Sequence, residues 1–215
     1  MNLKPTNDTV VGIDVGGIKK GFHGVAMRDG KFIHVEKGNL STIVSWIDAQ
    51  NPSVVAVDAP CKWSSDEGDW SSRRAERELS LFGEKISCFS TPSEKRAADR
   101  DFYRWVVNGQ TLYHALESAY PLFLGKRIQI RTCVETFPHA VACALAGEIV
   151  SAKQKSTTRR RVLRASSYDP TPLVNIDFVD AGLCSIAAAA FHSGHCRAFG
   201  EQEEGFIVVP DRQRV

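Results

Sequence analysis

The stretch Val10-Val11-Gly12-Ile13-Asp14-Val15 decides the fold, because a short β-branched run that closes on an acidic residue and a glycine pair is typical of a buried strand. Two further apolar runs follow, over residues 22–27 and 31–35. Asp29-Gly30 stands between them and is a strong hairpin signal. The first 35 residues therefore predict three strands joined by turns.

A helix and another buried strand come next. Apolar residues recur at helical spacing from Leu40 to Ile47, and Asn51-Pro52 ends that segment before the apolar run over 54–57. A strand reached through a helix usually runs parallel to an earlier strand of its sheet. We therefore expect strand 54–58 to lie beside strand 10–15, with their carboxyl ends adjacent, in an α/β fold.

The rest of the chain predicts one domain, residues 1–215, with a helical insertion at about 61–127. The insertion is charged and aromatic, with helices expected over 70–82 and 99–119. Sheet-forming sequence returns at 128–135, and Pro138 suits the first turn of a following helix. We expect a basic helix or loop at 153–165, a long helix at 175–193 and a short last strand at 205–210.

Acidic residues close three of the predicted strands. Asp14, Asp58 and Glu135 each follow an apolar run. An ionised carboxylate buried without a partner is very costly, so each must meet a cation or a hydrogen-bond donor. Carboxylates on neighbouring strands, about 4.8 Å apart, can share a hard divalent ion. The alternatives are turn or cap roles for Asp14 and Asp58 and an arginine partner for Glu135.

A fourth acid, Asp180, lies on the predicted helix 175–193. Asp177, Asp180 and Cys184 follow the i, i+3, i+7 rule and share one helix face. A helix docked on the sheet can present Asp180 to the other three acids, whereas the alternative has it facing solvent. Asp177 is only an accessory candidate, because the helix dipole alone favours an acidic residue in the first turn and so explains Asp177 without a functional role.

These motifs together resemble an uncharacterised family of predicted nucleases with the RNase H-like fold. The resemblance spans about residues 10–210 and is carried, in order, by Gly12-Ile13-Asp14, Val57-Asp58-Ala59-Pro60, Arg73-Arg74-Ala75-Glu76-Arg77-Glu78, Val134-Glu135-Thr136-Phe137-Pro138 and Asp177-Phe178-Val179-Asp180-Ala181. It implies a mixed five-stranded sheet with flanking helices and a helical insertion.

The resemblance also implies an activity. Asp14, Asp58, Glu135 and Asp180 would be the catalytic, metal-binding residues, with Asp14 as the bridging ligand. Two ions, Mg²⁺ or Mn²⁺, would support hydrolysis of phosphodiester bonds in nucleic acid. A homodimer is compatible with the resemblance, since superfamily members that act on branched DNA are dimers.

Basic residues near the acids are candidates for phosphate binding. Arg74 follows strand 54–58 and has Glu78 at i+4, while Lys155 and Arg159 share a helix face in the densest positive run. His139 lies close to Glu135 and is a candidate for proton transfer. The alternative for the arginines and Lys155 is a solvated charged face, and for His139 a structural role. The aromatic residues of the insertion can stack on bases or form the core of a small lid; they are Trp63, Trp70, Phe89, Tyr103, Trp105 and Tyr113.

Composition narrows the function classes. The net charge of +2 does not by itself indicate a nucleic-acid partner. Six scattered cysteines without a CxxC pair suggest neither a zinc knuckle nor a disulfide framework and favour a reducing, cytoplasmic location. We expect no membrane association. Two other functions stay open: an inactive RNase H-like domain that binds nucleic acid or protein, and a phosphotransferase of the sugar kinase or actin-like ATPase type, which would need a second core.

Overall fold

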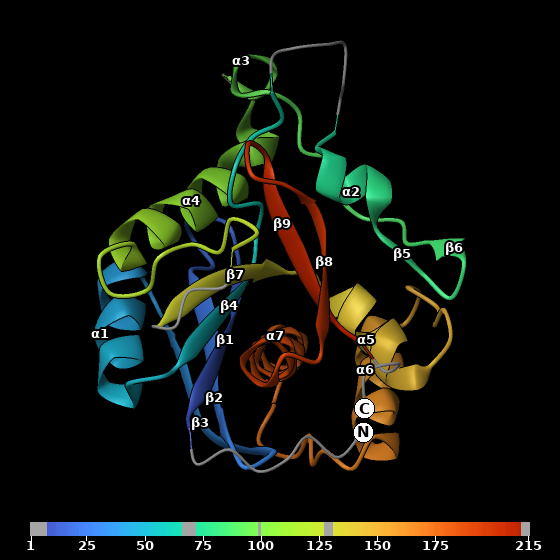
Figure 1. Cartoon of the computed structure of the whole chain (residues 1–215). Coiled ribbons are helices and arrows are strands. Elements are labelled where there is room, and N and C mark those ends of the chain that lie inside the picture. Colours follow the sequence, from blue (N-terminus) through green and yellow to red (C-terminus); the bar gives the residue numbers. More distant parts are fainter. Residues whose placement is uncertain (1–7, 66–71, 99, 127–130, 212–215) are drawn as a thin grey trace.

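A seven-stranded mixed sheet forms the centre of the molecule (Figure 1). The computed structural model describes residues 8–65, 72–98, 100–126 and 131–211. The strand order is β3-β2-β1-β4-β7-β9-β8. The strands are β1 (Val10–Val15), β2 (Phe22–Arg28), β3 (Lys31–Gly38), β4 (Val54–Asp58), β7 (Thr132–Thr136), β8 (Cys196–Glu201) and β9 (Gly205–Pro210).

The first five strands in this order give the RNase H-like arrangement. β1, β2 and β3 form the expected antiparallel meander, while β4 pairs parallel to β1 and β7 parallel to β4. The predicted count of five strands was too low. β9 adds to β7 in parallel, and the unpredicted β8 pairs antiparallel with β9. The strand ends beside the turn of this hairpin carry two glycines with positive φ, Gly200 in β8 and Gly205 in β9.

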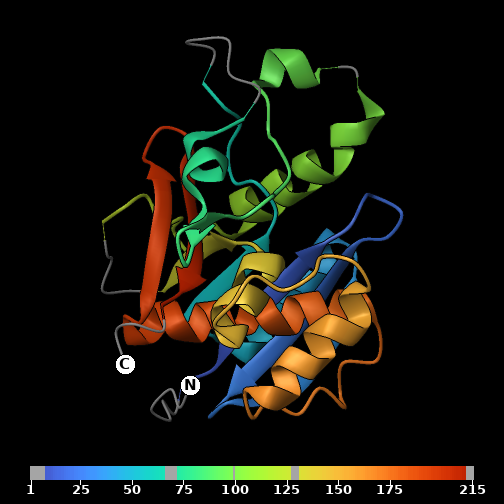
Figure 2. The same cartoon turned by 90° about the vertical axis from the view of Figure 1, so that its right-hand side faces the viewer.

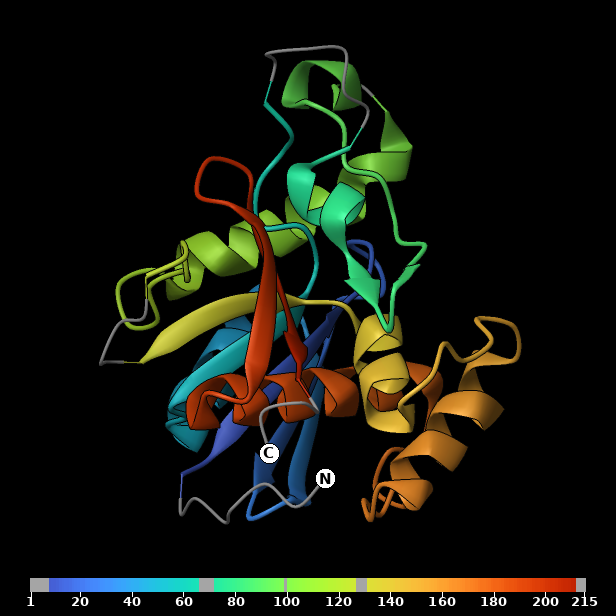
Figure 3. The same ribbon diagram turned by 45° about the vertical axis from the view of Figure 1, so that its right-hand side comes forward.

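Helices cover both faces of the sheet (Figure 1). α1 (Leu40–Gln50) and α4 (Arg104–Leu116) lie on one face, and the Asn39 side chain caps α1 by accepting from the Thr42 amide. The other face carries α7 (Ile176–Ser193), which packs on β1, β2 and β4, with α5 (Pro138–Ala146) and α6 (Lys155–Ala165) beside it (Figures 1 and 3).

The strands divide their side chains between two cores because successive residues of a strand point to opposite faces. Val10 and Val54 belong to the core beneath α7. Val11 and Val55 belong to the core beneath α1 and α4. This alternation fixes which face each acid at a strand end occupies.

The α7 helix is buried although it is apolar enough to span a membrane. Its 18 residues have a mean hydropathy of 1.2, and 72% of them are buried inside the protein. Figure 1 shows α7 end-on against the sheet. By these contacts it is the central helix of the core.

The insertion lies at one end of the sheet and is less helical than predicted (Figure 2). Where one helix over 70–82 was expected, there is a single short helix, α2 (Arg74–Glu78), and a hairpin of β5 (Ser80–Leu81) and β6 (Glu84–Lys85). Phe82 and Gly83 both have positive φ, the geometry of a tight hairpin turn. α3 (Glu94–Ala97) and a 3₁₀ turn, η1 (Asp101–Tyr103), lead into α4. Trp70, Asp99 and the start of the predicted strand at 128–130 lie outside the described residues.

Candidate metal centre

Three side chains form a row across neighbouring strands on the face covered by α7. Asp14 of β1 is in register with Asp58 of β4 on one side and with His23 of β2 on the other. Each lies two or four positions along its strand from a residue of the core beneath α7 (Val10, Val54 and Val25), so all three point to that face of the sheet. The parallel pairing of β1 and β4 was predicted from the sequence, and it brings Asp14 and Asp58 together.

Helix α7 brings two more acids to this row because it approaches β1 closely at Gly12. A Cβ atom on Gly12 would lie 2.1 Å from both the Ala181 carbonyl oxygen and the Ser185 amide nitrogen, so only glycine fits there. Asp177 and Asp180 lie on the first turns of α7. Asp180 is buried, which excludes the alternative in which it faces solvent.

Burial and repulsion between neighbouring carboxylates raise the pKa values of the acids in this row. Burial raises the pKa of Asp14 from 3.8 to about 7, and the charges of Asp180 and Asp177 contribute to the rise. Burial, followed by the charges of Asp14 and Asp180, also raises the pKa of Asp58 well above its usual value. The pKa of Asp180 is raised by burial too, although Arg159 opposes the shift. Such a cluster favours a cation.

The chain supplies two cations of its own to the α7 acids. Lys20 Nζ lies 2.6 Å from Asp177 Oδ1, and the buried Arg159 guanidinium pairs directly with Asp180. Within the part of the chain that the structure describes, no hydrogen bond or ion pair satisfies the Asp58 carboxylate. The residues therefore fit a divalent ion, because several carboxylate oxygens converge and, among the described residues, Lys20 and Arg159 pair with Asp177 and Asp180 and not with Asp14 or Asp58.

Glu135 is not brought into this row. β7 pairs with β4 so that Glu135 is opposite Val57, and Val57 points to the α1 and α4 face. Arg73 donates to both oxygens of Glu135, with Nη1 2.8 Å from Oε2, and the Cys61 amide donates to Oε2 at 2.8 Å. The predicted convergence of four acids is thus corrected to the arginine-paired alternative for Glu135, because side chains alternate along a strand.

The three predicted phosphate-binding residues differ in burial and in their ion-pair partners. Arg74 is exposed and pairs with Glu78, as its i+4 spacing indicated, and also with Glu201. Arg159 is buried against Asp180 and so is not on a solvated face. Lys155 is exposed, and its positive charge lowers the pKa of both Asp58 and Asp180.

His139 of α5 lies near the basic residues Arg159 and Lys155 of α6. Burial lowers its pKa, and the positive charges of Arg159 and Lys155 lower it further. Its Nε2 is 3.9 Å from the Cys143 sulfur one helical turn along α5. A largely neutral imidazole at this position is near the charged residues but contacts none of the acids through a described hydrogen bond.

Sequence reasoning missed three residues of this region. His23 lies in an otherwise apolar strand, and that contrast was its only signal. Lys20 lies in the turn between β1 and β2, and nothing in the local sequence distinguishes it from an exposed turn residue. Arg73 stands next to the selected Arg74, but it is the one of the two that is buried, bound to Glu76 and Glu135. Burial of one of two adjacent arginines is decided by tertiary packing.

Helix α4 fixes the segment after Asp58 from the opposite face. Tyr113 donates its hydroxyl to the Ala59 carbonyl at 2.9 Å, and a Cβ on Gly109 would lie 2.4 Å from the Ala59 Cβ. Asn108 donates to the Gly16 carbonyl at 2.9 Å. The turns that follow Asp14 and Asp58 are therefore both tied to α4.

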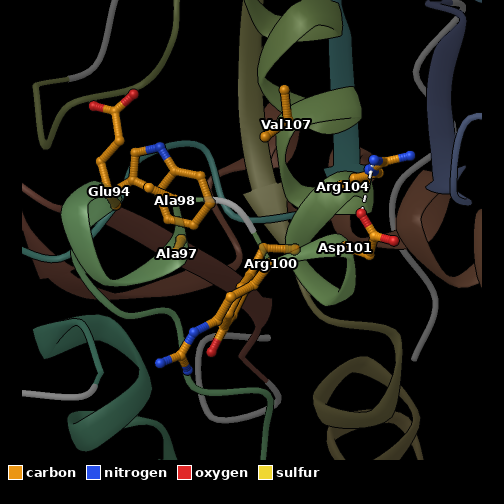
Figure 4. Close-up of a pocket in the computed structure, with 9 residues that line it drawn as sticks. Glu94, Ala97, Ala98, Arg100, Asp101, Arg104 and Val107 are labelled. Atoms are coloured by element: carbon orange, nitrogen blue, oxygen red, sulfur yellow. Dashed lines mark ion pairs between the residues drawn. The ribbon is translucent and has the colours of Figure 1, made fainter.

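The insertion carries a hollow of about 400 Å³ and a cluster of aromatic rings. Trp63 and Tyr103 line the hollow together with Arg100 and Arg104; Figure 4 shows Arg104 in an ion pair with Asp101 at its rim. The ring of Tyr103 also contacts Phe89, which meets Trp105 at 4.9 Å between centroids; the Trp63 and Tyr103 centroids are 6.2 Å apart. A smaller pocket lined by Asp58, Phe89 and Trp105 connects this cluster with the acidic row.

Comparison with known proteins identifies the family. The family model described as "Protein of unknown function (DUF429)" matches residues 12–205, which include both the acidic row and the insertion. The chain belongs to the DUF429 family.

A solved structure described as Thermus thermophilus RuvC is similar to this DUF429 protein with 17% sequence identity. The match covers 86% of this chain and 96% of that chain, at a TM-score of 0.42. A search of curated proteins gave no match. The strand order of the sheet supports the RNase H-like fold independently of this likeness.

Proposed function

We propose that this DUF429 protein is a metal-dependent nuclease that hydrolyses phosphodiester bonds. One observation carries the proposal: Asp14, Asp58, Asp177 and Asp180 converge on one face of the sheet, where burial and mutual repulsion raise the pKa values of Asp14, Asp58 and Asp180. Clustered carboxylates oppose polyanion binding unless cations neutralise them, which favours a metal-dependent enzyme over a domain that only binds nucleic acid.

Asp14, Asp58 and Asp180 would hold the ions, with Asp177 as an accessory ligand. Asp14 is the central one, because Asp58 lies beside it in the sheet and its pKa responds to Asp180 and Asp177. Oxygen ligands suit Mg²⁺ or Mn²⁺, and two ions, when bound, would activate water and offset phosphate charge. A ligand role for Glu135 stays a prediction that requires release from Arg73.

The residues around the acids suit contacts with a phosphate backbone. Lys155 is exposed close enough to affect Asp58 and Asp180, and Arg161 and Arg164 are exposed farther along α6. In the proposal these residues attract nucleic acid, and the rings of Trp63 and Tyr103 in the insertion stack on bases. His139, held largely neutral, is available to accept a proton.

The test is cleavage of single-stranded, duplex, hybrid and branched substrates in Mg²⁺ or Mn²⁺. Asp14→Asn and Asp180→Asn should abolish cleavage, whereas the matched control Asp48→Asn, an exposed acid of α1 on the opposite face, should retain it. Trp63→Ala should weaken substrate binding more than turnover. Absence of cleavage by the native protein would refute the nuclease proposal, and absence of metal binding as well would refute the metal centre.

A second candidate, an inactive domain that binds nucleic acid, is favoured by the ion pairs of Lys20 with Asp177 and of Arg159 with Asp180. These cations partly neutralise the cluster without a metal. Under this alternative the native protein binds nucleic acid equally well in EDTA and in Mn²⁺, and Asp14→Asn leaves that binding unchanged. The same substrates therefore separate the two candidates.

A further inference from the structure

His23 is a buried histidine without a hydrogen-bond partner. Its side chain has no exposed surface, and neither Nδ1 nor Nε2 has a partner in the described part of the chain. The ring meets Phe178 edge to face, at 5.0 Å between centroids, which fixes its plane but satisfies neither nitrogen. A buried polar group in this state is costly unless something else binds it.

Both ring nitrogens face carboxylates at distances too long for hydrogen bonds. Nδ1 lies 4.0 Å from Asp14 Oδ2, and Nε2 lies 3.8 Å from Asp177 Oδ2. One ligand atom from each of Asp14, His23 and Asp177 can be chosen so that all three lie within 4.8 Å of one another. Ligands held at about 2.0–2.2 Å from one ion are separated by roughly 3–4 Å, so small adjustments bring these atoms into a shared coordination sphere.

We infer that His23 is a metal ligand and that, with Asp14 and Asp177, it forms a mixed nitrogen and oxygen site for a transition-metal ion such as Mn²⁺. The inference rests on the proposed function for the acidic centre and adds to it a nitrogen ligand and a metal preference. Imidazole nitrogen binds divalent transition metals, most strongly Zn²⁺ and its neighbours and also Mn²⁺ in sites rich in carboxylates, whereas Mg²⁺ takes oxygen ligands.

The surroundings of His23 support coordination through one nitrogen. Each ring nitrogen has its own carboxylate: Nε2 can ligate the ion beside Asp177 Oδ2 while Nδ1 directs its N–H at Asp14 Oδ2, which leaves Asp14 Oδ1 for the ion. A carboxylate that accepts the second N–H is common for metal-bound histidines. Lys20 occupies Asp177 Oδ1 and leaves Oδ2, the oxygen that faces His23. The chain's own cation therefore does not block the site.

The test is pulsed electron paramagnetic resonance of Mn²⁺ bound to the full-length protein, together with calorimetric titration of Mn²⁺ and Mg²⁺. We expect coupling of Mn²⁺ to a ¹⁴N nucleus in the native protein. In His23→Gln we expect loss of that coupling and a drop of about tenfold or more in the preference for Mn²⁺ over Mg²⁺. The control is His139→Gln, which alters another buried histidine near the acids and should keep the coupling.

The outcomes separate this inference from the proposed function. Mn²⁺ bound to the native protein without ¹⁴N coupling overturns the inference, even if the protein cleaves nucleic acid. Retention of the coupling in His23→Gln also overturns it. If the coupling is present and no substrate is cleaved, the nuclease proposal fails and the metal site stands. The measurement on the native protein needs no variant, so it decides the matter even if His23→Gln does not fold.

Discussion

Removing the charge of Asp14 should stabilise the metal-free protein at neutral and alkaline pH. The carboxyl is buried, and its pKa is raised from 3.8 to about 7. Between these values the unfolded chain has released a proton that the folded chain still holds, so the free energy of unfolding falls as pH rises. The contribution of Asp14 is therefore a destabilisation that grows from about pH 4 and is nearly complete above pH 7.

The magnitude follows from the two pKa values. One pH unit of difference corresponds to about 1.4 kcal/mol, so the limiting cost of ionising Asp14 is about 4 kcal/mol. Between pH 5 and pH 8 the cost should rise by about 3 kcal/mol. Asp14→Asn removes this term and also relieves Asp58, whose pKa Asp14 raises.

The assay is urea unfolding of native protein and Asp14→Asn in EDTA at several pH values. The difference between the two proteins cancels the opposite trend from His23 and His139, whose lowered pKa values add stability as pH rises toward their ordinary range. Saturating Mn²⁺ should stabilise only the native protein, by about 2.7 kcal/mol at one hundred times Kd. If the difference in free energy of unfolding between the native protein and Asp14→Asn does not change with pH in EDTA, the raised pKa of Asp14 is refuted.

Three further predictions follow from the packing. Gly12→Ala should push α7 away from β1, lower the free energy of unfolding by more than about 2 kcal/mol and weaken Mn²⁺ binding in calorimetry. The control Gly17→Ala should change neither quantity, because its Cβ would meet no atom within 4 Å. Glu135→Gln should lower the free energy of unfolding by about 3 kcal/mol, because it leaves the buried Arg73 charge uncompensated. The Mn²⁺ affinity should stay the same, and a large loss of affinity would show that Glu135 is a ligand. Lys20→Met should raise Mn²⁺ affinity severalfold, because it removes a positive charge that repels the ion from Asp177. Unchanged affinity would count against the proposed role of Asp177.

Outside the insertion and β8, the order of elements could be read from the sequence because local chemistry sets it. Asp29-Gly30 forms the turn of the first hairpin, Asn51 ends α1, and Pro138 starts α5. The apolar runs before Asp14 and Asp58, joined through a helix, predicted two parallel strands with neighbouring carboxyl ends. Helical spacing placed Asp177 and Asp180 on one face of α7.

Tertiary structure alone decided which other side chains join Asp14 and Asp58. The register of β7 against β4 turns Glu135 to the face opposite Asp14, and no local pattern sets that register. The antiparallel pairing of β2 brings His23 beside Asp14, and the approach of α7 at Gly12 brings Asp180 to the row. Residue type and spacing along the chain thus determined the acids available for a metal centre. Strand register and helix docking, which depend on contacts between distant segments, determined its members.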